Sequence, residues 1–270
     1  MPKVDMISEM IIGGSIFILG AIVGSFLNVC IVRLPKEKSV VFPGSHCVHC
    51  QKPIAWYDNI PLISYFVLGG KCRFCHQKIS IRYWIVELIT AISFFLFYKY
   101  FGLTLVLIPY LVFHSGLIVA TFVDLEHRII PDEISVGGMV VGLIFSLVIP
   151  QLHGTSSHLL GLGRSLLGVL IGGGSIYAMG MLGDFLFKKE SMGGGDVKLL
   201  AMVGSFLGWQ MAVLAFFIAP FFGAVLGIIV KIRTNESAIA YGPFLALGSL
   251  ISLFWGNKII HWLIYSYGLG

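Results

Sequence analysis

Residues 103–123, LTLVLIPYLVFHSGLIVATFV, contain no charged side chain, and Asp124 follows them directly. An apolar run of about 20 residues is long enough to cross the hydrocarbon core of a bilayer as a helix. The whole chain has this character, because 57% of its 270 residues are hydrophobic and only 11% are charged. Soluble domains carry about 25% charged residues. The sequence therefore predicts an all-α protein that crosses a membrane several times.

Apolar runs elsewhere in the chain predict about eight transmembrane helices in total. Their approximate ranges are 7–32, 83–101, 103–123, 134–150, 161–187, 197–208, 210–230 and 243–266. The sixth range is short for a span, so we expect it to tilt or to begin inside a cavity. Glycines four residues apart, such as Gly20 and Gly24, recur in these ranges and predict close packing between helices.

Basic residues set the expected orientation of the chain. With the N-terminus outside, 14 of the 18 Lys and Arg residues fall on the cytoplasmic side and 4 on the outer side. The positive-inside rule then places residues 34–82 in the cytoplasm, and Asp124 and Asp196 at the cytoplasmic ends of their helices. The basic residues are concentrated in one segment, so the net charge of +5 does not predict a nucleic-acid partner.

The polar stretch from residue 34 to residue 82 holds two CxxC pairs that are separated by 21 residues. The four cysteines are Cys47, Cys50, Cys72 and Cys75. Two such pairs can place four thiolates tetrahedrally around Zn²⁺, and a four-cysteine site leaves no open position for catalysis. The reducing cytoplasm disfavours disulfides, which are the alternative together with redox chemistry. We expect a structural zinc site that orders residues 45–80, with His46, His49 and His76 as substitute ligands.

Asp124 and Asp196 are the candidate catalytic pair. Acidic residues at the ends of membrane helices are uncommon and often functional, although each alone has helix capping as its alternative role. Asp132, which precedes an apolar run, is expected to be such a cap. The residues before Asp196 are Gly193, Gly194 and Gly195, where the backbone can approach a substrate closely. Two adjacent carboxylates share one proton, so one can deprotonate water while the other polarises a carbonyl. The pair predicts peptide hydrolysis without an acyl-enzyme.

Several motifs, in this order along nearly the whole chain, resemble those of the type IV prepilin peptidases, membrane aspartyl proteases of the GxGD class. Besides the cysteine pairs, they are Gly24-Ser-Phe-Leu-Asn28, Arg33-Leu-Pro35, Trp56-Tyr-Asp-Asn-Ile-Pro61, Ile79-Ser-Ile-Arg-Tyr83 with Glu87, Asp124 with Ile130-Pro-Asp132, and Gly193-Gly-Gly-Asp196. The chain departs from the family pattern at Trp84, where relatives usually have proline, and at Ala91, where they often have glycine.

The resemblance implies a bifunctional enzyme of the bacterial inner membrane with its active site facing the cytoplasm. It implies cleavage of the basic leader of prepilins or pseudopilins by Asp124 and Asp196, then methylation of the new N-terminal amine with S-adenosylmethionine. The family's zinc cysteines match the four cysteines of the loop. Candidate methyl-donor residues are Asn28, Arg82 and Glu87, with the alternative that they hold the loop to the membrane core.

The expected domain organisation has three parts: a first transmembrane helix at residues 1–33, a zinc-binding loop associated with methyl transfer at 34–82, and a peptidase core at 83–270. Two other classes of function use the same features. A transporter would use the carboxylates on an ion path, and a thiol oxidoreductase would use the CxxC pairs. Neither class predicts a Gly-Gly-Gly-Asp sequence at a cytoplasmic helix start.

Overall fold

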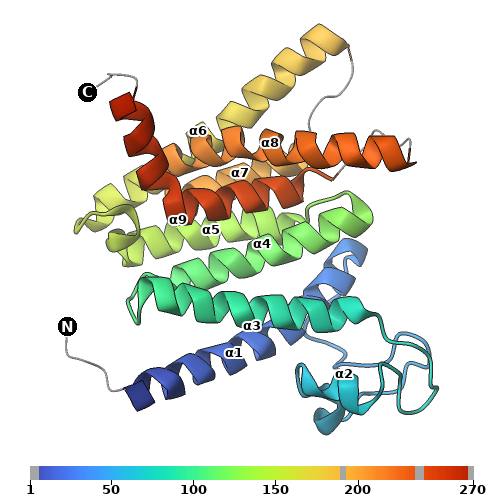
Figure 1. Cartoon of the computed structure of the whole chain (residues 1–270). Helices are drawn as coiled ribbons and strands as arrows, with labels where there is room; N and C mark the ends of the chain where they lie inside the picture. Colours follow the sequence, from blue (N-terminus) through green and yellow to red (C-terminus); the bar gives the residue numbers. More distant parts are fainter. Residues whose placement is uncertain (1–5, 189–192, 235–239, 267–270) are drawn as a thin grey trace. The chain divides into compact units, whose positions relative to one another are not determined.

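The computed structural model describes residues 6–188, 193–234 and 240–266 (Figure 1). These residues form helices, and their extended pairing is limited to two isolated β-bridges. The α-helices are α1 (Met6–Arg33), α2 (Ile63–Val67), α3 (Ile81–Phe101), α4 (Leu107–His127), α5 (Asp132–Val148), α6 (His158–Phe187), α7 (Gly194–Leu207), α8 (Trp209–Thr234) and α9 (Gly242–Ser266). The 3₁₀-helices are η1 (Leu34–Lys36), η2 (Trp56–Asn59) and η3 (Pro150–His153). The predicted all-α class is confirmed.

Five helices among the described residues are long and apolar enough to cross a membrane, which makes this a multi-pass membrane protein. These stretches are Met6–Lys36, Ile81–Phe101, Leu107–His127, His158–Leu186 and Gly242–Ile264. The remaining three ranges that the sequence predicts as spans also coincide with helices, namely α5, α7 and α8. Of these, α8 contains a shorter apolar stretch, Trp209–Val225.

The chain forms two compact units, residues 1–119 and 120–270, which divide within α4. In the first unit, α1 packs along α3 in the antiparallel sense. A Cβ atom on Gly20 would lie 2.8 Å from Ala91 Cα, and one on Gly24 would lie 2.8 Å from Glu87 Cα. Both glycines are therefore required for this approach, as their spacing predicts. Ala91 is fully buried against Gly20, so the departure from glycine is accommodated by the missing side chain opposite.

In the second unit, α7 is the central helix. It contacts α5, α6, α8 and α9, and residues Leu199–Phe206 are all buried. A Cβ atom on Gly172 of α6 would lie 2.7 Å from Leu200 O, so the backbones of α6 and α7 are in close contact. The sides of α7, which is 14 residues long, are therefore covered by neighbouring helices.

The start of α5 corrects one expectation. Its N-cap is Pro131, which makes no side-chain capping bond, and Asp132 is the first helical residue. The Asp132 carboxylate instead accepts two hydrogen bonds from Lys198 Nζ, at 2.7 and 2.8 Å. The prediction that Asp132 caps the helix is wrong, because its side chain pairs across to α7, two residues after Asp196.

Candidate functional sites

The four predicted cysteines come together in the first unit. Cys47 Sγ lies 3.8 Å from Cys75 Sγ, Cys50 Sγ lies 4.0 Å from Cys72 Sγ, and all four sulfurs lie within 4.8 Å of one another. A tetrahedron with Zn–S bonds of about 2.3 Å has sulfurs about 3.8 Å apart, so the cluster fits a zinc ion. Disulfide sulfurs would lie about 2.05 Å apart, and all four residues are free thiols. The substitute ligands His46, His49 and His76 are not in the cluster.

The two cysteine pairs have the same backbone geometry, displaced by 25 residues along the chain. In the first, Gln51 N donates to Cys47 O at 2.9 Å; in the second, His76 N donates to Cys72 O at 3.0 Å. Gln51 and His76 have φ of +58° and +57°, which turns the chain back towards the metal position. A β-bridge closes each knuckle, His46 with Pro53 and Lys71 with Lys78. Two matching knuckles supply two thiolates each, as a tetrahedral site requires.

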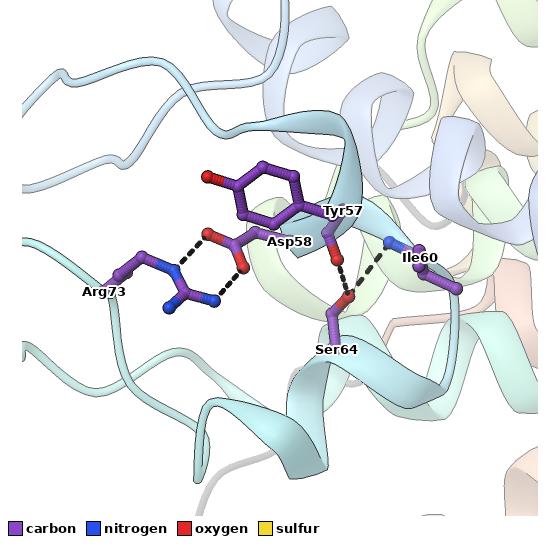
Figure 2. A network of polar contacts seen from close by, with 5 residues as sticks. All are labelled: Tyr57, Asp58, Ile60, Ser64 and Arg73. Atoms are coloured by element: carbon purple, nitrogen blue, oxygen red, sulfur yellow. Dashed lines mark hydrogen bonds and ion pairs between the residues drawn. The ribbon is translucent and has the colours of Figure 1, made fainter.

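An ion pair braces the second knuckle against the segment between the two knuckles (Figure 2). Arg73 Nε donates to Asp58 Oδ2 at 2.7 Å, and its guanidinium lies over the Tyr57 ring, 5.7 Å from the centroid. The contact with Arg73 holds the pKa of Asp58 below its ordinary value. The segment is fixed further by Ser64 Oγ, which donates to Tyr57 O and accepts from Ile60 N.

In the second unit, Asp124 lies one turn before the end of α4 and is 6% exposed. The helix ends at a left-handed residue, Arg128 (φ +56°), whose N–H donates to Asp124 O at 2.8 Å. The Asp124 side chain accepts a hydrogen bond of 2.7 Å at Oδ2 from the N–H of Gly242, the first residue of α9. This carboxylate therefore caps the N-terminus of a helix 118 residues further along the chain.

Asp196 lies in the first turn of α7, within range of the charge of Asp124. The preceding glycines have different surroundings. A Cβ atom on Gly193 would lie 3.4 Å from Asp196 Oδ2, and one on Gly195 would lie 3.2 Å from Ile130 Cβ. Gly194 would meet nothing within 4 Å. Gly195 thus packs tightly against Ile130, while Gly193 borders the carboxylate itself.

Tyr241 and Gly242 also belong to the site, although neither was predicted from the sequence. A Cβ atom on Gly242 would lie 2.8 Å from Asp124 Oδ2, so only glycine fits there without displacing the carboxylate. Tyr241 O accepts the first-turn N–H groups of α9, and Tyr241 Oη is buried with no hydrogen-bond partner among the described residues. Burial, with the charge of Asp196 as the second cause, raises the pKa of Tyr241 to about 12. The one available signal was a Gly-Pro dipeptide opening an apolar run, which is typical of a helix start.

Each of the two carboxylates lies at the N-terminus of a helix. Asp196 is in the first turn of its own helix, and Asp124 binds the first N–H of α9. The partial positive charge of a helix N-terminus stabilises an anion in either place. Mutual repulsion opposes the double negative charge. The pair is therefore suited to hold one proton between two carboxyl groups, the state that activates water at one and polarises a carbonyl at the other.

The candidate methyl-donor residues lie at the junction of α1 and α3. Asn28 Nδ2 donates to Tyr83 O at 2.9 Å, and Glu87 accepts the Leu62 N–H at 2.8 Å. The Arg82 guanidinium lies over the Tyr83 ring, 5.1 Å from the centroid. Asn28 and Glu87 therefore make the contacts that hold the helices and the loop together, which is the alternative role that the sequence left open. Asn28 is 2% exposed, and its Oδ1 has no hydrogen-bond partner among the described residues.

Comparison with known proteins matches these two regions separately. The family model described as the bacterial peptidase A24 N-terminal domain matches residues 18–101, which hold the four cysteines. The model described as the type IV leader peptidase family matches residues 111–228, which hold both aspartates. A prepilin leader peptidase/N-methyltransferase of Pseudomonas aeruginosa is 34% identical over 90% of this chain and 90% of its own length. The chain belongs to the type IV leader peptidase family.

Other relatives of this leader peptidase carry the same name. The prepilin leader peptidase/N-methyltransferase of Myxococcus xanthus is 40% identical over 82% of this chain, which covers 64% of that protein's length. The one from Legionella pneumophila is 33% identical over 90% of this chain and 91% of its own length. No solved structure matches the chain. Membership confirms the resemblance drawn from the motifs and identifies the chain as an enzyme of this family.

Proposed function

We propose that this leader peptidase is an aspartyl endopeptidase that removes the basic leader of type IV prepilins or pseudopilins. The observation that carries the proposal is the meeting of Asp124 and Asp196, 72 residues apart in sequence, at the starts of two helices in one unit. The names of the relatives, which are prepilin leader peptidases, support the substrate class.

The chemistry follows from one shared proton. The ionised carboxylate takes a proton from water, whose oxygen attacks the scissile carbonyl carbon. The protonated carboxyl donates its proton to the carbonyl oxygen, and the resulting tetrahedral diol collapses by breaking the C–N bond. The leaving amine receives the proton that the first carboxylate took from water, and a hydroxyl of the diol returns its proton to the second carboxylate as the new carboxyl group forms, which restores the shared-proton state. Gly242 positions Asp124 throughout, because its N–H fixes one carboxylate oxygen and leaves the other for the reaction.

We place the site at the cytoplasmic face of the bacterial inner membrane, in a chain of about eight spans. The distribution of basic residues supports this orientation. Five helices are long and apolar enough to cross a membrane, and α5, α7 and α8 would be the other three spans. For the short α7, the support is its position among four other helices, where it needs little contact with lipid.

We propose that the first unit carries the second activity, methylation of the new N-terminal amine. S-adenosylmethionine supplies the methyl group when bound. The chain would hold it beside α1 and α3, where Asn28 Oδ1 and Trp84 Nε1 are buried without partners among the described residues and Glu87 accepts the Leu62 N–H. These groups would orient the donor, since methyl transfer needs proximity and alignment more than acid–base chemistry.

The zinc ion is proposed to be structural, held by Cys47, Cys50, Cys72 and Cys75. The proposed domains are the first helix (1–33), the zinc loop (34–82) and the peptidase core (83–270). In this scheme the loop, together with the adjoining ends of α1 and α3, serves methyl transfer, and the rest of the core serves cleavage.

The test uses purified full-length protein with a prepilin and, separately, a pre-cleaved pilin. Asp124→Asn and Asp196→Asn are each expected to abolish cleavage, and Asp196→Asn is expected still to methylate the pre-cleaved pilin. Glu126→Gln is the matched control, because this exposed acid lies two residues after Asp124 on the same helix. Substantial cleavage by Asp196→Asn would refute the catalytic assignment. Loss of both activities in folded Asp196→Asn would refute the division between the units.

A further inference from the structure

The short helix α2 exposes its apolar side chains, whereas a helix on the surface of a soluble domain buries them. Ile63, Phe66 and Val67, at the spacing of one helix face, are 59%, 65% and 73% exposed. Ser64, which lies outside this face, is only 9% exposed. Large apolar side chains therefore point outward while a hydroxyl points inward.

Polar contacts fix this orientation. Ser64 Oγ accepts a hydrogen bond from Ile60 N at 2.9 Å and donates to Tyr57 O at 3.3 Å (Figure 2). These bonds satisfy backbone groups of the preceding turn, so rotating α2 to bury its apolar face would break them. The Leu62 N–H, just before α2, is bound by Glu87 of α3 at 2.8 Å. The outward orientation of the apolar face is thus fixed by hydrogen bonds of the loop.

The position of α2 indicates what covers this face. The Phe66 ring packs edge-on against Trp84, with centroids 5.4 Å apart, and Trp84 lies in the first turn of α3. Because Ile81–Phe101 is long and apolar enough to cross a membrane, its first turn lies at a bilayer interface. Trp side chains favour that depth. The exposed face of α2 is therefore continuous with a helix end that meets lipid.

Charge in the loop favours an anionic surface. Residues 34–80 contain six basic side chains and two acidic ones, and one of the acids, Asp58, is paired with Arg73. A four-thiolate zinc site adds a formal charge of about −2, so the segment stays net positive. The basic residues are Lys36, Lys38, Lys52, Lys71, Arg73 and Lys78. Basic segments next to a membrane span are attracted to anionic headgroups within a Debye length.

We propose that the apolar face of α2 (Ile63, Phe66 and Val67) inserts into the interface of an anionic bilayer beside α3. The zinc loop is then held on the membrane by its own side chains as well as by the two helices that flank it. This anchoring depends on neither catalytic activity.

The test replaces Phe66 with the photoreactive residue p-benzoylphenylalanine in the full-length protein. The protein is placed in nanodiscs of phosphatidylethanolamine and phosphatidylglycerol, irradiated, and analysed by mass spectrometry for lipid adducts. Position Leu96, 54% exposed on α3, is the positive control, and exposed Gln51 in the first knuckle is the loop control. We expect lipid adducts at 66 and 96 and several-fold fewer at 51.

Adducts at position 66 only to this protein, or only to added prepilin, would overturn the proposal in favour of a protein occupant. Lipid adducts at 51 equal to those at 66 would also overturn it, because the loop would then lack an inserted face. Replacing phosphatidylglycerol with phosphatidylcholine should lower the yield at 66 by at least about twofold relative to 96. An unchanged ratio would refute the anionic preference.

Discussion

Replacing Gly242 with alanine tests whether the start of α9 positions the carboxylate pair. The new Cβ would lie 2.8 Å from Asp124 Oδ2 and 3.3 Å from Asp124 Cβ and Cγ. Non-bonded carbon contacts lie at about 3.5–4.0 Å, so the carboxylate must retreat by roughly half an ångström. That retreat also lengthens and weakens the 2.7 Å hydrogen bond from the Gly242 N–H.

Two effects set the expected size of the loss. A hydrogen bond to a charged group contributes about 1.5–3 kcal/mol, which is roughly 10- to 100-fold in rate if it is needed only for catalysis. Misplacement of a reacting group by about 1 Å can cost roughly 100-fold. Because both effects act on the same atom, they are not additive. We expect Gly242→Ala to lower kcat for prepilin cleavage roughly 10- to 100-fold.

The assay measures cleavage of a prepilin by purified protein in detergent, with thermal unfolding of each variant measured alongside. Gly137→Ala is the neutral control, because a Cβ there would meet nothing within 4 Å. Gly248→Ala is the packing control, because its Cβ would lie 2.7 Å from Ala215 O of α8, away from Asp124. Gly248→Ala should lower the unfolding temperature with a smaller effect on kcat.

Cleavage by Gly242→Ala at the rate of Gly137→Ala would refute the positioning role. So would an equal loss of kcat in Gly248→Ala at equal stability, because disturbed helix packing would then explain both variants. Retained methylation of a pre-cleaved pilin by Gly242→Ala is expected, since the substitution lies in the second unit.

Three other changes give separate checks. The purified protein should contain one Zn²⁺ per chain by elemental analysis. The Cys72→Ser variant should lack the zinc, and its loop should be cleaved faster by added protease while α3–α9 stay intact. Metal-free wild-type protein with cysteine disulfides would contradict this. Lys198→Met removes the exposed ion pair with Asp132 and should change the free energy of unfolding by less than about 1 kcal/mol, whereas a larger loss in chemical denaturation would show that the pair fixes α7. The Glu87→Gln variant keeps an acceptor for the Leu62 N–H and should retain methylation, whereas the Glu87→Ala variant should lose methylation. Equal methylation by the two variants would exclude a positioning role for Glu87.

Composition and periodicity were sufficient to predict the helices. Apolar runs without charges have few alternatives in a membrane, because each backbone N–H and C=O must be satisfied within the segment. Helices lie at all of the predicted ranges for this reason. The cysteine cluster was equally predictable, since two CxxC pairs carry their local turn geometry with them. The cap assigned to Asp132 was wrong because its partner, Lys198, is distant in sequence.

The sequence by itself determined the all-α membrane class, the four thiols that fit a metal and the two aspartates worth testing. Each rests on interactions within one segment or on a short spacing. Only the tertiary structure decided what holds Asp124, because its partner is a backbone N–H 118 residues away. Every residue except proline has a backbone N–H, so the sequence does not show which one binds Asp124, and the only sequence feature is the glycine that permits the close approach. Which face of α2 points outward was likewise set by the hydrogen bonds of Ser64 to another turn, and no periodicity within five residues could reveal it.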